Sequence, residues 1–355
     1  MPKHVKWIIC VIIIISTLLS VLVSCKDSGE ENELFSEGLI AVKIDGKWGY
    51  IDKSGRLVIK ARFDSASAFS CGLACVGNDG KYGYINTDGE IVIDLQFDGV
   101  SSFREDRARV TVGENYRYIN KKGEYITDES FVFGADFSNG LACVVINEKY
   151  GYIDRNGKMA IEPIYAMATE FSEGYAGVRL SEDGKCGFIN KKGKTVIDFA
   201  YDEVGSFVDG VARVGLGETL CYIDKKGGVR LILNKTKSDD FHEEMARVVD
   251  DEGLFGFIDT TGKTVIDHKY EFAGSFSNGL ALVYKNGKVG YIDKNGKLAF
   301  EPKYELFYSS RNAGFDYTSD GYTIVILNKK FGVIDKNGNE ILPCQYEGIN
   351  GFEAD

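Results

Sequence analysis

The sequence predicts an all-β protein built as a tandem array of nine three-stranded repeats of about 34 residues, stacked as an open superhelix. A closed, propeller-like ring is the alternative, placed second because nine blades exceed the usual four to eight. Three observations carry this prediction. A nine-residue box recurs nine times, the 355 residues include 42 Gly but only 4 Pro, and nothing in the array has the length and 3.6-residue period of a helix.

The recurring box reads K-x-G-(Y/F)-I-(D/N)-x-x-G and is clearest at residues 47–55, 81–89, 149–157 and 288–296. Its closing glycine, and the Ile two places after its first glycine, are present in all nine copies. Two copies replace the first glycine, so we expect local irregularity there. That position is occupied in turn by Gly49, Gly83, Arg117, Gly151, Gly187, Cys221, Gly256, Gly290 and Gly332.

A second box, F-S-x-G-L-A-x-V, precedes the first, for example at residues 35–42, 69–76, 137–144 and 276–283. One repeat then reads as a turn (F-S-x-G), a strand (L-A-x-V), a polar loop, a strand (K-x-G-Y-I), a turn (D-x-x-G), a strand (x-x-V-I) and a connection. In D-x-x-G the Asp accepts backbone N–H groups and the Gly supplies a positive φ, which closes a hairpin. The middle strand is apolar on both faces, so its aromatic residues are predicted to form core ladders. Trp48, in the first repeat, is the best candidate for an aromatic residue free to bind a ligand.

These two boxes resemble the WG (KWG) repeats of bacterial proteins, over residues 35 to about 352. Only the first copy, at residues 47–49, keeps the Trp of the motif. The resemblance implies a β-rich repeat array with an extracytoplasmic or interaction role, and it implies no defined activity.

Residues 1–24 are interpreted as a signal peptide, because Lys3 and Lys6 precede an uncharged, largely apolar stretch that ends at Cys25. The sequence Leu22-Val23-Ser24-Cys25 resembles the lipobox of bacterial lipoproteins, which implies lipid attachment to Cys25 and cleavage before it. The alternative is an uncleaved transmembrane anchor. Residues 25–34 are interpreted as a flexible acidic tether and residues 35–355 as the repeat array. Lipid attachment at Cys25 and an uncleaved transmembrane anchor both place the array outside the cytoplasm, attached to a bacterial membrane.

The net charge of −11 becomes −13 once residues 1–24 are removed, since that segment carries two lysines and no acid. This balance argues against a nucleic-acid partner. We expect no cofactor, metal or catalytic set, and predict a non-catalytic, membrane-anchored scaffold that binds a protein or an envelope polymer. The alternatives are an envelope enzyme with a site in the groove or in a late insertion, and a structural spacer.

The longest interval between successive boxes runs from Gly290 to Gly332 and indicates an insertion at residues 305–322. Surface insertions in repeat arrays often carry function, so four of its residues join Trp48 as candidate binding residues: Tyr308, Arg311, Phe315 and Tyr317. A column of acids follows the third strands and is interpreted as loop caps, or alternatively as an acidic ridge for cations or a basic partner. The column comprises Asp64, Asp98, Asp202, Glu271, Glu305 and Glu347.

Six cysteines lie in the array and are interpreted as small buried thiols, with disulfides as the alternative. They are Cys71, Cys75, Cys143, Cys186, Cys221 and Cys344.

Overall fold

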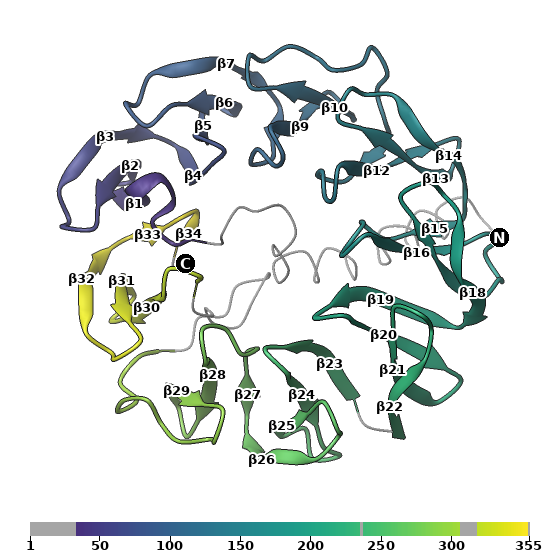
Figure 1. Ribbon diagram of the computed structural model, residues 1–355. Helices are drawn as coiled ribbons and strands as arrows, with labels where there is room; N and C mark the ends of the chain where they lie inside the picture. The colour runs from purple at the N-terminus through teal and green to yellow at the C-terminus, as the bar shows by residue number, and fades with distance from the viewer. Residues whose placement is uncertain (1–32, 235–236, 306–317, 354–355) are drawn as a thin grey trace, which may run out of the picture.

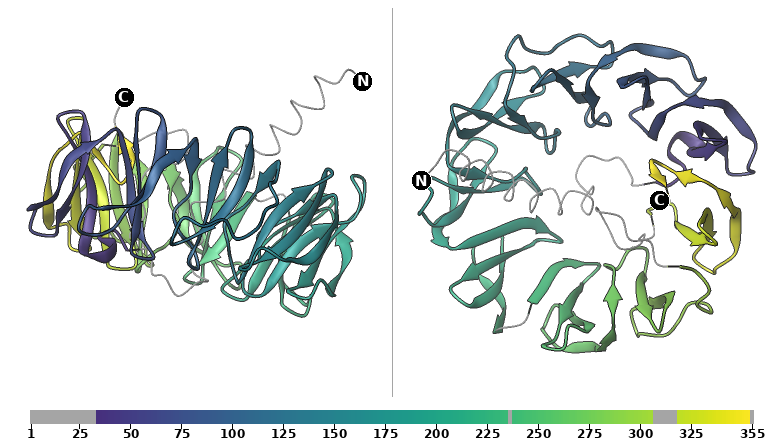
Figure 2. Two further views of the ribbon diagram at one scale, coloured as in Figure 1. Left: turned by 90° about the horizontal axis from the view of Figure 1, so that it is seen from above. Right: turned by 180° about the vertical axis from the view of Figure 1, so that it is seen from behind.

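The computed structural model describes residues 33–234, 237–305 and 318–353, which form nine β-sheets arranged as blades around a common axis (Figure 1). One short 3-10 helix, η1 (Ser36–Gly38), precedes the first strand. The ring is seen edge-on and from behind in Figure 2. No helix among the described residues is long and apolar enough to cross a membrane.

We number the blades in chain order and give their strands from the axis outward. Blade 1 contains β33 (Gly348–Ile349), β1 (Leu39–Ile44), β2 (Lys47–Asp52) and β3 (Leu57–Phe63), with β34 (Phe352–Glu353) added beyond β33. Blade 2 contains β4 (Ser65–Ser70), β5 (Leu73–Asn78), β6 (Lys81–Ile85) and β7 (Ile91–Phe97). Blade 3 contains β8 (Gly99–Val100), β9 (Arg107–Val112) and β10 (Asn115–Asn120).

Blade 4 contains β11 (Phe133–Gly134), β12 (Leu141–Ile146), β13 (Lys149–Asp154) and β14 (Met159–Tyr165). Blade 5 contains β15 (Met167–Ala168), β16 (Tyr175–Arg179), β17 (Cys186–Asn190) and β18 (Thr195–Tyr201). Blade 6 contains β19 (Glu203–Val208), β20 (Val211–Leu216), β21 (Thr219–Asp224) and β22 (Val229–Asn234).

Blade 7 contains β23 (Lys237–His242), β24 (Met245–Val249), β25 (Phe255–Asp259) and β26 (Thr264–Tyr270). Blade 8 contains β27 (Phe272–Ala273), β28 (Leu280–Lys285) and β29 (Lys288–Asp293), and blade 9 contains β30 (Tyr322–Leu327), β31 (Lys330–Asp335) and β32 (Glu340–Tyr346).

The predicted open stack of three-stranded repeats is therefore wrong, and the protein is a nine-bladed β-propeller with four-stranded blades. The fourth strand is the innermost one, and it lies in the segment that the sequence pattern assigned to a connection. This strand is only two residues long in β8, β11, β15 and β27. Such a short pairing leaves no alternating pattern of its own, so the sequence gives no sign of a strand there.

Three blades complete this plan less regularly. The outer strand is reduced to isolated bridges in blade 3, through Phe131 and Tyr125, and in blade 8, through Tyr304 and Leu298. In blade 9 the N–H of Glu305 donates to the carbonyl of Ile326, and residues 306–317, which follow, lie outside the described part.

The ring closes by pairing the two ends of the array. β33 runs antiparallel to β1, with Val42 opposite Ile349 and Lys43 opposite Gly348, so the end of the array supplies the innermost strand of blade 1. The Asn350 amide oxygen accepts the N–H of Ala41 at 3.0 Å, which extends the contact. Closure gives both terminal blades a neighbour, and an open stack would have left those two edges free.

The first glycine of the box is required by the outer strand. Tyr82 pairs with Phe97 and Tyr84 with Ile93, so the outer strand bulges opposite Gly83. A Cβ on Gly83 would lie 2.4 Å from the carbonyl oxygen of Ile93. In blade 6, where Cys221 replaces the glycine, the outer strand pairs without a shift from Thr219 to Tyr222. Blade 6 therefore lacks the bulge that faces Gly83 in blade 2, and in blade 3, where Arg117 replaces the glycine, the outer strand is reduced to isolated bridges, so the irregularity expected at both copies is confirmed.

The blades are joined by buried tyrosines of the middle strands. Tyr84 is fully buried, and its hydroxyl donates to the carbonyl of Ser101, on the inner-strand segment of the next blade, at 2.8 Å. The equivalent hydroxyls of Tyr50, Tyr118 and Tyr152 make the same contact. The aromatic ladder predicted for this column is thus confirmed as core.

Replacing Tyr84 with Phe should lower the free energy of unfolding by about 1 kcal/mol, because the ring stays packed while one buried hydrogen bond is lost. The midpoint of urea unfolding measures this. Tyr82→Phe is the matched control, since the Tyr82 hydroxyl has no hydrogen bond within the described residues. Equal effects of the two substitutions would contradict the role given to the Tyr84 hydroxyl.

The two faces of the ring carry different loops, because successive strands in a blade alternate in direction. The F-S-x-G and D-x-x-G turns lie together on one face, which we name the glycine-turn face. The turns between the second and third strands, and the connections between blades, lie on the opposite face, which we name the connection face. All nine closing glycines of D-x-x-G have positive φ, which confirms the predicted hairpins.

Candidate binding surface

The acidic column following the outer strands holds blades together. Asp64 Oδ1 lies 2.5 Å from Lys47 Nζ of blade 1, and its Oδ2 accepts the N–H of Asp79, in a blade 2 turn, at 2.9 Å. The hydrogen bond from Lys47 is the main cause of a lowered pKa for Asp64. Asp98 repeats this arrangement with Lys81 and the N–H of Gly113. The geometry is that of loop caps.

The x position of F-S-x-G also serves blade contacts. Glu37 accepts the N–H of Gly72 at 3.0 Å, and Glu105 accepts that of Gly140 at 3.0 Å. Each acceptor belongs to one turn and each donor to the F-S-x-G turn of a later repeat. The polar residues that recur in the repeat are therefore used to stabilise the ring.

The residues that interrupt the repeat form a different group. Arg109 lies at the x position of L-A-x-V, which other repeats fill with small or apolar residues such as Ala41, Cys75 and Leu282. Its Nη1 donates to the carbonyl of Gly134 at 2.7 Å, and its Nε lies 3.4 Å from Asp136 Oδ1. The side chain thus spans from blade 3 to the inner-strand segment of blade 4.

A second pair repeats this geometry further around the ring. Arg213 Nη1 donates to the carbonyl of Ser238 at 3.3 Å, and Arg213 Nε lies 3.4 Å from Asp240 Oδ1. Arg247 contacts Asp239 and the carbonyl of Ala273. The same departure from the repeat therefore recurs in blades 6 and 7.

Asp136, Glu170 and Asp240 share the position directly before the Phe of F-S-x-G, where other repeats carry Leu, Ala or Ser. Burial, reinforced by the neighbouring Asp136, raises the pKa of Glu170, while Arg104 and Arg109 act in the opposite direction. Burial likewise raises the pKa of Asp240, opposed by Arg213 and His242. Asp136 follows β11, Glu170 follows β15 and Asp240 lies in β23, and these innermost strands line the centre of the ring (Figure 1).

We name the group formed by Arg104, Arg109, Asp136 and Glu170 the axial cluster. It combines two carboxyl groups with two guanidinium groups across blades 3 to 5. Such a mixed set can hydrogen-bond a polar partner or pair with its charges. Within the described residues, no group of three or more His, Cys, Asp or Glu side chains could hold a metal ion.

The axial cluster predicts a measurable pH dependence. Unfolded Glu170 ionises near its ordinary pKa of about 4.3, whereas the folded ring retains the proton to higher pH. Between those two values the folded state binds more protons, so stability is lost as pH rises through that window. Glu170→Gln should therefore be more stable than the wild type at pH 7, with the difference shrinking towards pH 4. Urea unfolding across this pH range measures it, with the exposed Glu148→Gln as control; a pH-independent difference would contradict the assignment.

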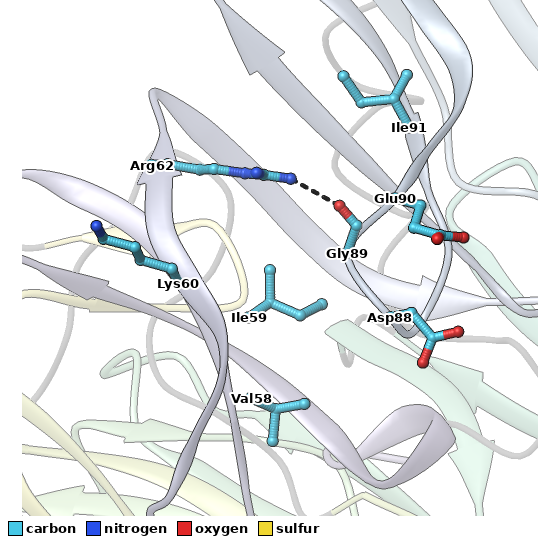
Figure 3. Close-up of a pocket in the computed structure, with 8 residues that line it drawn as sticks. All are labelled: Val58, Ile59, Lys60, Arg62, Asp88, Gly89, Glu90 and Ile91. Carbon is cyan, nitrogen blue, oxygen red and sulfur yellow. Dashed lines mark hydrogen bonds between the residues drawn. The ribbon is translucent and has the colours of Figure 1, made fainter.

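A shallow pocket of about 470 Å³ lies on the outer rim, between β3 and the turn that joins β6 to β7 (Figure 3). Val58, Ile59 and Ile91 form its apolar part. Arg62 Nη2 crosses it to donate to the carbonyl of Gly89 at 2.7 Å. The remaining lining residues are Lys60, Asp88 and Glu90.

The predicted binding residues are placed as follows. Trp48 is 2% exposed and packs with Tyr50 and Phe63, close to Gly348 of the closing strand. The ligand-binding role of Trp48 stays a prediction, and the burial of its side chain argues against it. The other four, Tyr308, Arg311, Phe315 and Tyr317, lie outside the described residues, as does the predicted lipid site Cys25.

Four of the six array cysteines are buried, as predicted, and Cys71 and Cys344 are half-buried; the buried four are Cys75, Cys143, Cys186 and Cys221.

Sequence reasoning missed Arg109, Asp136, Glu170 and their counterparts in blades 6 and 7. The available signal was positional, since each places a charge in a column that is otherwise small or apolar. In a nearly symmetric array, such departures are where a distinct function can be encoded.

Comparison with protein families matches most of the chain to the model described as "WG containing repeat". The matched residues are 33–48, 48–82, 82–116, 116–150, 150–186, 187–218, 255–288, 290–331 and 331–355. No curated protein matches the sequence.

Among solved structures, the chain is similar to one titled "Crystal structure of the eukaryotic initiation factor". The TM-score is 0.61 at 11% identity, over 88% of this chain and 96% of that one, so the likeness concerns the fold alone. A computationally designed protein, Ika8, matches with a TM-score of 0.45 at 12% identity, over 77% and 93% of the two chains. BamB from Moraxella catarrhalis matches with a TM-score of 0.41 at 12% identity, over 77% and 94%.

Proposed function

Because this chain belongs to the family of WG-containing repeat proteins, we propose that it is a non-catalytic binding scaffold, anchored outside the cytoplasm of a bacterium through lipidated Cys25. Its partner is a protein or an envelope polymer. The observation that carries the binding proposal is the division of the polar side chains. Those that recur in the repeat connect blades, whereas several that break it gather in the axial cluster.

The axial cluster suits a polar partner better than an apolar one. Its carboxyl and guanidinium groups are held by neighbouring blades, so they lose little conformational freedom when a partner binds. A partner that carries both donors and acceptors, such as a polar peptide loop or a polysaccharide, matches this mixture of charges.

Capture from a detergent-solubilised envelope extract tests the binding proposal. The bait is the chain from residue 26 onward, which contains every described blade and the closing strands. The double variant Asp136→Asn/Glu170→Gln should fail to capture an envelope component that the wild-type bait captures. Glu148→Gln/Glu218→Gln, with the same charge change at exposed turns of the connection face, should still retain it. A wild-type bait that retains nothing would favour the spacer.

Anchoring is tested separately through Cys25. Cys25→Ala should release or misprocess the protein, whereas the wild type should appear in the membrane fraction beginning at residue 25. A mature wild-type protein that still begins at Met1 would reject lipid attachment and favour the uncleaved anchor.

A further inference from the structure

The glycine-turn face carries a continuous arc of basic side chains over blades 3 to 6. All belong to the D-x-x-G turns or directly follow them, and we name this set the basic arc. It comprises Lys121, Lys122, Arg155, Lys158, Lys191, Lys192, Lys194, Lys225 and Lys226.

Most of the basic arc is available to a partner. Six of its lysines are exposed and form no ion pair within the described part of the chain: Lys122, Lys158, Lys191, Lys192, Lys194 and Lys226. In blades 3 and 5 the turns begin with Asn120 and Asn190 in place of Asp, and the acid at the blade 3 turn is Glu124, whose carboxylate accepts the Asn120 amide N–H at 2.8 Å.

The acids on this part of the face are largely engaged. The Asp154 carboxylate accepts the N–H of Asn156 at 2.8 Å, and Asp224 accepts that of Lys226 at 2.9 Å. Glu173 accepts the N–H of Gly210 and pairs with Lys225 at 3.0 Å. Over these four turns and the residue after each, nine basic side chains stand against three acids, Glu124, Asp154 and Asp224, so this part of the face is positive although the whole protein is acidic.

The opposite face has the reverse character. The turns between the second and third strands, which lie on the connection face, carry mostly acidic residues. These are Asp45, Asp79, Glu114, Glu148, Glu182, Asp183, Glu218, Asp250, Asp251 and Glu252. An anionic surface would therefore attract the glycine-turn face and repel the connection face.

The tether reaches the ring on the glycine-turn face. The N–H groups of Leu34 and Phe35 are held by the Asp320 carboxylate, and Phe35 is buried at the first F-S-x-G turn. This point lies in blade 1, across the ring from blades 4 to 6 (Figure 1). Glu33 lies eight positions after Cys25, so an extended tether reaches at most about 28 Å.

We propose that the basic arc docks on the anionic lipid headgroups of the membrane that holds Cys25, so that the ring lies with its glycine-turn face towards the bilayer. The proposal rests on the anchoring part of the proposed function. A lipid chain at one edge of the ring and a polybasic arc at the opposite edge supply two attachment signals, which together hold a protein more firmly than one. The attraction acts within about 10 Å of the surface at 0.1 M salt, so only the protruding turns contribute.

Vesicle flotation tests this with the acyl-free chain from residue 26 onward. It is compared on phosphatidylcholine vesicles and on vesicles in which phosphatidylglycerol replaces part of the phosphatidylcholine, at low and near-physiological salt. The wild type should float with the anionic vesicles alone and should dissociate as salt increases. Lys191→Gln/Lys192→Gln/Lys194→Gln should weaken partitioning about a hundredfold at low salt, since each of the three lysines near the surface contributes to the attraction.

The matched control, Lys285→Gln/Lys288→Gln/Lys329→Gln, removes the same charge from exposed lysines on the connection face. It should partition like the wild type, and equal losses in both variants would overturn the proposal by tracing binding to net charge. The proposal would also be overturned if the wild type failed to float with anionic vesicles. It would be overturned likewise if the basic arc bound an acidic protein or polymer but did not bind vesicles. None of these results bears on Cys25 processing or on partner capture, which test the proposed function separately.

Discussion

Replacing Gly83 with Ala should lower the free energy of unfolding by about 3 kcal/mol, one of the largest effects expected of a single methyl group in this ring. The added Cβ would lie 2.4 Å from the Ile93 carbonyl oxygen and 2.6 Å from that of Asp94. Both contacts are with backbone atoms of the bulged outer strand, so no side-chain rotation relieves them. The midpoint and slope of urea unfolding measure the loss.

Cys221→Ala is the matched control, because it changes the equivalent position in the blade that lacks this bulge. The site already accommodates a Cβ, and the buried thiol contributes only a small apolar area, so the loss should stay near 1 kcal/mol. If Gly83→Ala were no more harmful than Cys221→Ala, the explanation of the box glycine by the bulge would be wrong.

Truncation after Glu347 should destabilise the ring by at least about 3 kcal/mol, because it removes Ile349 from the core between blades 1 and 9. It also frees the edge of β1, which pairs with β33 through Val42 and Lys43. An unpaired strand edge is a template for pairing with another chain. We therefore expect a lower urea midpoint together with concentration-dependent association in light scattering.

Two further variants separate the causes. Ile349→Ala removes core volume but keeps the backbone pairing, so it should destabilise the ring without promoting association. Truncation after Glu353 removes only residues 354–355 and should behave like the wild type. A chain truncated after Glu347 that stays monomeric and as stable as the wild type would contradict closure by β33.

Local patterns were sufficient for the three outer strand positions and for the hairpin turns. Gly55 N–H donates to the Asp52 carbonyl at 2.9 Å, and Asp52 Oδ1 accepts the N–H of Ser54 at 3.0 Å, as the D-x-x-G pattern predicts. These contacts join residues within four positions of each other. The residue types alone therefore specify them.

The axial cluster could not be predicted in the same way. Arg109 and Asp136 are far apart in sequence and meet only because β9 and the inner-strand segment after β11 belong to adjacent blades. The acidic column allowed two interpretations, and Asp64 became a loop cap only when Lys47 and the turn at Asp79 were placed around it. Which residues of a repeat face one another depends on how the repeats are arranged in space.

The sequence by itself determined that this protein is a nine-fold β-repeat, because each repeat carries its own turn glycines and apolar strand residues. Only the tertiary structure decided that the repeats form a ring. The fourth strand is often two residues long, and its pairing is fixed by the neighbouring strand. Closure depends on the rotation accumulated over nine blades and on a contact between Val42 and Ile349, at opposite ends of the array. No local pattern encodes either quantity.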